Sequence, residues 1–234
     1  MHLEDLQASF FKYFLHTTSI KRVSADKMMV KARGPVWHQK QKAQGIIPDG
    51  LTGLDCDATW SKSHADGWVY GHGTFSLVSH KTPVLGLFQW MPNSAHEAKR
   101  LKTEIIKFTG LVKTVCMDSK ADDQKLYQLL KRQHQMQLLT VARQGMDKTP
   151  ARKKMIQEMQ TSQNRKIYKQ RKVTVEPMQG LVKELFDLET CWMRGDESNR
   201  WLFAAMGVAV QIAQHQAYRR GTSTWNIKEE VLGL

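Results

Sequence analysis

Three carboxylates, those of Asp57, Asp118 and Glu176, have the side-chain type and the placement that a metal site needs. The first is expected near the end of a strand and the second closes a short apolar run. The third precedes Pro177, a residue that suits the first turn of a helix. Carboxylates that converge without partners repel one another, and divalent cations relieve that repulsion. Two Mg²⁺ ions, with Mn²⁺ as the alternative, could then support phosphoryl transfer at these residues.

Spacing alone does not single out these acids, since the chain has 22 Asp and Glu residues. Asp55 is the rival of Asp57 as the first ligand, and Asp122 and Asp123 compete with Asp118. Solvated acids at the ends of loops are therefore the alternative interpretation, with Asp122 as a surface acid of a helix.

The charge of the chain favours a polyanionic partner. Its 234 residues carry 35 Lys and Arg against the 22 acids, a formal net charge of +13. Residues 143–172 hold ten of these basic residues and two acids, which gives a local net charge of +8. Such a segment could neutralise phosphates, so double-stranded DNA is the expected partner, although a ribosome-associated or membrane-surface protein would have a similar bulk charge.

The cysteines and histidines offer no second chemistry. Cys56, Cys116 and Cys191 lack metal-ligand or redox spacing, which favours buried thiols in a reducing cytoplasm. The nine histidines also lack ligand spacing, and His72 and His80 are expected at the surface. No apolar run approaches the roughly 18 residues of a membrane span, so no membrane partner is expected.

Hydrophobic periodicity predicts the elements that must position the three carboxylates. We expect an amphipathic helix over 1–15, a loop over 31–50, strands over 51–60, 67–80, 82–92, 111–118 and 136–143, and helices over 94–108, 121–134, 150–163, 176–190 and 197–219. Ser94 and Glu97 have the spacing of a capping box at a helix start. Three successive strands followed by strand–helix alternation predict an α/β fold with a ribonuclease H-like mixed sheet flanked by helices. The first and fourth strands are neighbours in such a sheet, so Asp57 and Asp118 would meet at one edge.

Four segments together resemble a known family. They are "GLDCDATW", "GWVYGHG", "VCMDSKADD" and "YKQRKVTVEPMQGLVK", and they resemble the catalytic domain of bacterial insertion-sequence DDE transposases over residues 51–220. The last segment is the most specific, because Tyr168, Arg171, Glu176 and Lys183 follow the order of the family's third motif. Lys172 has the spacing to the glutamate that the family's arginine usually has.

The resemblance implies a function and a set of roles. It implies a transposase that cleaves DNA at the ends of an insertion sequence and transfers the strand to a target. The implied catalytic and metal-binding residues are Asp57, Asp118 and Glu176, and the implied DNA-binding residues are Tyr168, Arg171, Lys172 and Lys183. A homodimer is one state that the sequence allows, and the implied location is the bacterial cytoplasm, on the nucleoid when DNA is bound.

The resemblance also sets the expected domains and the competing functions. Residues 1–50 are expected to form an N-terminal helix and basic linker, as a truncated DNA-binding region, residues 51–220 the catalytic domain, and residues 221–234 a C-terminal tail. A catalytically inactive transposase remnant that binds DNA is the alternative function. A host nuclease of the same fold, which cleaves DNA without joining ends, is a third.

Overall fold

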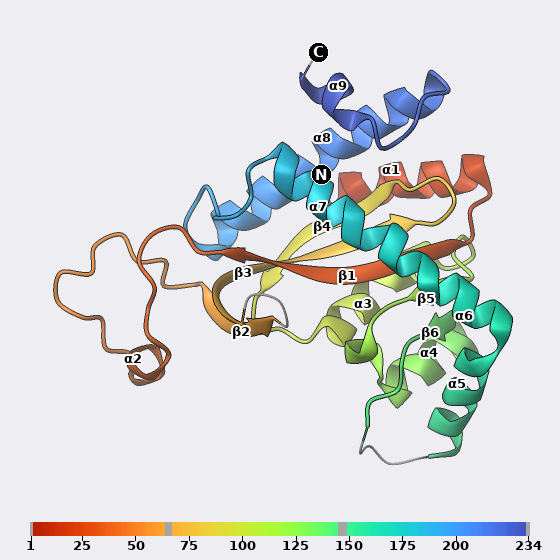
Figure 1. The fold of residues 1–234 in the computed structure, drawn as a ribbon, viewed down its shortest axis with the longest axis horizontal. Helices are drawn as coiled ribbons and strands as arrows, with labels where there is room; N and C mark the ends of the chain where they lie inside the picture. The colour runs from red at the N-terminus through yellow and green to blue at the C-terminus, as the bar shows by residue number, and fades with distance from the viewer. Residues whose placement is uncertain (1, 64–66, 145–148, 233–234) are drawn as a thin grey trace.

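The computed structural model describes residues 2–63, 67–144 and 149–232 (Figure 1). The strands are β1 (Arg22–Lys31), β2 (Thr59–Ser63), β3 (Gly67–Ser79), β4 (Leu85–Pro92), β5 (Thr114–Cys116) and β6 (Gln137–Leu139). The helices are α1 (Leu3–Thr18), α2 (Gln39–Gln44), α3 (Glu97–Ile105), α4 (Gln124–Gln133), α5 (Pro150–Gln160), α6 (Ser162–Lys169), α7 (Val175–Leu185), α8 (Asp196–Arg219) and α9 (Ile227–Leu232). Short 3-10 helices are η1 (Ile106–Phe108), η2 (Ser119–Ala121) and η3 (Gln170–Val173). None of the helices in these ranges is long and apolar enough to cross a membrane.

The described strands form one mixed sheet. β1 lies between β3, with which it pairs antiparallel, and β5, with which it pairs parallel. β6 continues the parallel part beside β5, while β2 and β4 both pair antiparallel with β3. This arrangement confirms the predicted mixed α/β sheet flanked by helices.

The central strand is not where the sequence pattern placed it. The prediction of a first strand over 51–60 is wrong, because residues 51–58 form turns and β2 begins only at Thr59. Gly50 and Gly53 have φ angles of 79° and 70°, which a strand does not accommodate. The central strand is β1, so residues 1–50 and 51–220 contribute to the same sheet.

Alternating side chains on β1 divide the core into two layers. Val23 and Ala25 pack against α1, α3 and α4 on one face of the sheet. Met28 and Val30 pack against α7 and α8 on the other. Full burial of each such aliphatic side chain stabilises the fold by roughly 1.5–3 kcal/mol. β1 is therefore held from both sides, and the acid at its centre, Asp26, has little freedom to move.

Candidate metal centre

Three acids meet where β1, β5 and α3 approach one another. Ligand oxygens of Asp26, Glu97 and Asp118 all lie within 4.8 Å of one another. β1 and β5 run parallel with Ser24 opposite Cys116. Asp26 and Asp118, each two residues further along the chain, therefore fall side by side. Asp118 is the N-cap of η2, where its side chain accepts a hydrogen bond from the Lys120 N–H at 3.0 Å.

Burial makes this cluster electrostatically unfavourable on its own. Burial raises the pKa of Asp26 from 3.8 to about 7, and the nearby carboxylates of Glu97 and Asp118 add to the shift while Arg171 opposes it. Burial also raises the pKa of Glu97, against the effect of Lys120. A positive charge placed among these groups would lower both pKa values.

One carboxylate oxygen of the cluster is not paired with the lysines that contact Glu97. The Glu97 side chain is 1% exposed, and its Oε1 lies 2.6 Å from Lys120 Nζ and 3.7 Å from Lys27 Nζ. Its Oε2 is buried and has no hydrogen-bond partner among the described residues. A buried carboxylate oxygen without a partner is costly unless a cation or donor reaches it. The cluster therefore fits a divalent metal ion, which prefers hard oxygen ligands.

Arg171 joins the cluster to Glu176, the predicted third ligand. Its guanidinium contacts Asp26 Oδ2 at 2.8 Å and Glu176 Oε1 at 2.9 Å. The Glu176 side chain is 43% exposed at the start of α7 and lies outside the group of mutually close oxygens. Burial raises the pKa of the neighbouring Tyr168 phenol, while Arg171 opposes that shift. Arg171 thus brings Glu176 and Tyr168, two residues of the third motif, into the region of Asp26 and Asp118.

The structure places Asp57, the predicted first ligand, elsewhere. Its exposed carboxylate accepts a hydrogen bond at 3.1 Å from the backbone N–H of Asp196, at the start of α8. Neither Asp57 nor its rival Asp55 belongs to the group of close oxygens around Asp118.

Asp55 instead anchors its loop through a buried histidine. His72 Nδ1 accepts a hydrogen bond from Trp90 Nε1 at 3.0 Å, so its Nε2 carries the proton and donates to Asp55 Oδ2 at 2.9 Å. The expectation that His72 and His80 lie at the surface is wrong, because they are 1% and 2% exposed. His80 Nε2 bonds Ser24 Oγ at 2.7 Å instead.

Other predicted groups have structural partners. Asp122 is not a surface acid: its buried carboxylate lies 2.6 Å from Arg152 NH2, which removes that arginine from the basic surface. Lys183 lies 2.8 Å from Glu189 Oε1, and Lys172 is exposed on η3. Lys148 lies outside the described residues.

Sequence reasoning missed two members of the cluster, Asp26 and Glu97. The capping box assigned to Ser94 and Glu97 is wrong, because α3 begins at Glu97 after His96 and the glutamate points into the cluster. The available signal for Asp26 was an acid midway between the apolar residues Val23 and Met28 in an otherwise strand-compatible segment.

These features define an α/β protein in which Asp26 on β1 and Asp118, just beyond the adjacent parallel strand β5, meet the buried Glu97 of α3. No protein-family model and no curated protein matches the chain. Among solved structures, it is similar to piggyBac transposase in a synaptic complex with hairpin DNA, with a TM-score of 0.54 and 11% sequence identity. The similarity covers 90% of this chain and 51% of the piggyBac chain, so this chain spans about half the length of that protein. At this identity the likeness concerns the fold, which is transposase-like.

Proposed function

We propose that this chain is a DDE-type transposase of the bacterial insertion-sequence class, with a ribonuclease H-like core that carries out metal-dependent cleavage and strand transfer of DNA. The observation that carries the proposal is the proximity of Asp26 on β1 to Asp118, two residues past the end of the parallel strand β5, beside a Glu97 oxygen that has no hydrogen-bond partner among the described residues. The strand order β4-β3-β1-β5-β6, three antiparallel strands followed by two parallel ones, supports the assignment of the core. The transposase-like fold is consistent with both.

In this proposal Asp26 replaces Asp57 as the first metal ligand, and Asp118 keeps its predicted role. Glu97 completes the buried set, and Glu176 becomes available when Arg171 releases it. Mg²⁺ or Mn²⁺ bound there would activate the attacking oxygen and stabilise the leaving oxygen of a phosphodiester. Arg171 forms ion pairs with two of these carboxylates, those of Asp26 and Glu176.

The residues that hold DNA would surround the cluster. Lys172 on η3 is exposed, as are the basic residues of α5 and α6 other than the buried Arg152, namely Lys153, Lys154, Arg165, Lys166 and Lys169. Tyr168 and Arg171 lie between these residues and Asp118. Double-stranded DNA, whose phosphates would release counterions on binding, is the proposed partner. A homodimer would allow two DNA ends to be processed together.

Calorimetric titration with Mg²⁺ and Mn²⁺ tests the ligand assignment. Asp26→Asn and Asp118→Asn are expected to abolish metal binding, whereas Asp57→Asn, the matched control, is expected to bind as the wild type does. Cleavage of a supercoiled plasmid should follow the same pattern, with DNA binding retained by each variant. Metal binding that survives in Asp26→Asn but is lost in Asp57→Asn would reverse the assignment.

One observation favours a second function, that of a DNA-binding protein without catalytic activity. Arg171 already occupies Asp26 and Glu176, as a permanent replacement for a metal ion would. An inactive chain would bind DNA equally well with EDTA or Mg²⁺ and would show no metal binding in the calorimeter. If the chain is inactive, Arg171→Ala should also show neither DNA cleavage nor metal binding.

A further inference from the structure

The segment between β1 and β2, residues 32–58, forms an arm that extends beyond the sheet. Lys31 and Thr59, the residues at its two ends, are both register partners of Gly71 in β3. They therefore flank one strand, about 10 Å apart, which is two strand spacings. Figure 1 shows the arm projecting past the end of the sheet, with α2 in its outer part. α2 has no buried residue.

The arm has a fixed shape despite its exposure. The buried Trp37 donates from Nε1 to the Ile46 carbonyl at 2.8 Å, and Trp60 Nε1 donates to the Trp37 carbonyl at 2.9 Å. Lys42 Nζ donates to the Cys56 carbonyl at 2.6 Å and lies 4.7 Å from the centre of the Trp37 ring. Such hydrogen-bonded aromatic anchors preorganise a surface, so that binding does not require the segment to be ordered first.

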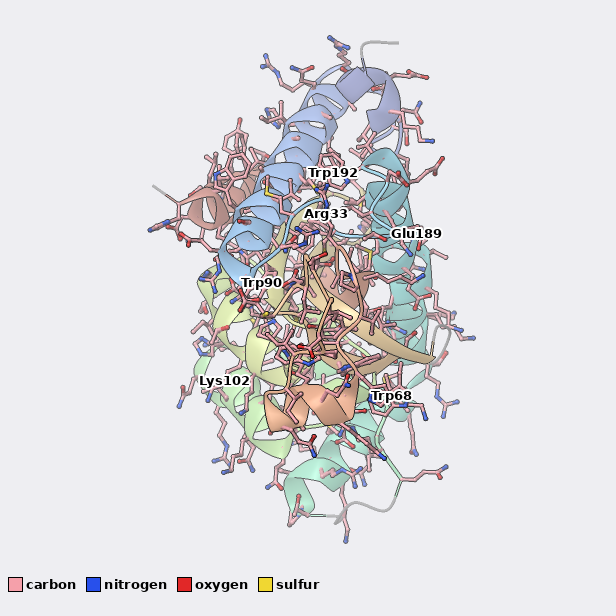
Figure 2. The ribbon with its side chains drawn as sticks, turned by 90° about the vertical axis from the view of Figure 1, so that its left-hand side faces the viewer. Arg33, Trp68, Trp90, Lys102, Glu189 and Trp192 are labelled. Carbon is pink, nitrogen blue, oxygen red and sulfur yellow. The ribbon has the colours of Figure 1, made fainter. Side chains whose placement is uncertain are left out.

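The cations of the arm are concentrated in its first part. Residues 31–48 contain four Lys and Arg and no acid, whereas the three acids of the arm, Asp49, Asp55 and Asp57, lie in its second part. Lys31 and Lys40 are exposed, and neither forms an ion pair within the described residues. Arg33 donates to the carbonyl of Trp192, and Figure 2, which looks onto the arm from its outer side, shows the two residues close together.

Exposed aliphatic side chains accompany these cations. Val36, Ile46 and Ile47 are 57%, 53% and 52% exposed. Exposed apolar side chains among cations are typical of elements that enter the DNA minor groove, where apolar residues press against base steps while Lys and Arg contact phosphates. An acidic protein partner would pair with the cations, but it would not explain why Ile46 and Ile47 are exposed near them.

The arm also lies at a suitable distance from the acidic cluster. It continues directly from β1, and the five residue steps from Asp26 to Lys31 span about 17 Å. That distance is about half of one helical turn of DNA, which rises roughly 34 Å. A straight duplex that runs along β1 with one phosphate at the cluster would therefore pass the base of the arm at Lys31 within about half a turn.

We propose that the arm binds the DNA duplex that flanks the acidic cluster, with Lys31 and Lys40 on phosphates and Ile46 and Ile47 in the minor groove. This inference rests on the proposed function, because it requires that the chain bind DNA. In this proposal the arm holds the part of the duplex that lies beyond the phosphate that reacts.

Fluorescence anisotropy with a labelled 30-base-pair duplex, measured over a series of salt concentrations, tests the proposal. Lys31→Gln/Lys40→Gln is expected to weaken binding and to reduce the slope of log affinity against log salt by about 2, close to 0.9 per lost phosphate contact. The matched control is Lys21→Gln/Lys113→Gln, which removes the same charge at the opposite end of β1, where the Lys113 N–H donates to the Lys21 carbonyl at 2.8 Å. The control should leave the slope unchanged.

The aliphatic pair is tested separately. Ile46→Ser/Ile47→Ser should lower affinity several-fold with the salt slope intact, because an apolar contact releases no counterions. Equal slopes for the wild type and Lys31→Gln/Lys40→Gln would overturn the arm proposal while DNA binding itself stands. A wild-type chain that binds no DNA would overturn the proposed function as well. A wild-type dimer that Ile46→Ser/Ile47→Ser converts to monomers, with unchanged DNA affinity, would assign the aliphatic pair to self-association instead.

Discussion

Asp26→Asn should stabilise the metal-free protein in a strongly pH-dependent way. Burial raises the pKa of this carboxyl from 3.8 to about 7, so the native state retains a proton that the unfolded chain has lost. The group therefore favours folding most at low pH, and its contribution declines as the pH rises from 3.8 to about 7. The wild type should lose about 2 kcal/mol from this group between about pH 5.5 and about pH 8. The asparagine, which does not titrate, keeps an oxygen that can accept from the Lys27 N–H.

Urea denaturation in EDTA at these two pH values measures the effect. The difference in free energy of unfolding between Asp26→Asn and the wild type should grow by about 2 kcal/mol toward the higher pH. Mg²⁺ added at the higher pH should stabilise the wild type and leave the variant unchanged, since binding to the native state raises stability. An Asp26→Asn difference that is the same at both pH values would refute the claim that this carboxyl is buried among like charges.

Three further predictions concern the scaffold. Arg152→Met should lower the free energy of unfolding by about 3–5 kcal/mol, because the Asp122 carboxylate would stay buried without its partner, and Arg152→Met/Asp122→Leu should recover most of that loss in urea denaturation. Gly71→Ala should destabilise the fold by about 3 kcal/mol or more, since its Cβ would stand 2.0 Å from the Val30 carbonyl oxygen, and an unchanged urea midpoint would contradict this strand spacing. Cys56 alone should react with Ellman's reagent in the native protein, because it is exposed while burial raises the pKa of the other two thiols to about 12; reaction of all three before unfolding would disprove their burial.

The sequence was informative where the local signal for an element is strong. The segments that became α3, α4 and α8 have apolar periodicity, those that became β3 and β4 are rich in β-branched and aromatic residues, and each forms the predicted type of element. Asp118 lies two residues after a short buried strand, close to the strand end where it was expected. Period and burial agree best in α4, whereas β3 and β4 are buried along nearly their whole length, polar residues such as Thr74 and Gln89 included.

The errors arise where a polar residue serves a buried partner. β1 was overlooked because Asp26 and Lys27 interrupt its apolar pattern, and both turn toward other ionisable groups that lie far away in the sequence. Asp55 was placed in a strand, but its loop is held by His72, a tertiary contact that no local pattern encodes. Glu97 matched a capping motif, and a partner 23 residues later, Lys120, determines its real orientation.

The two ends of the arm mark a position in this fold at which one connecting segment could be replaced by another. Since both ends flank Gly71 about 10 Å apart, a segment of different length or composition could join β1 to β2 without altering the strands that carry the acids. Loop-closure entropy grows only slowly with loop length, so such replacements would cost little stability. Related chains could therefore diverge in this insertion while the chemistry stays constant, and a designer could graft another nucleic-acid-binding loop at the same junction.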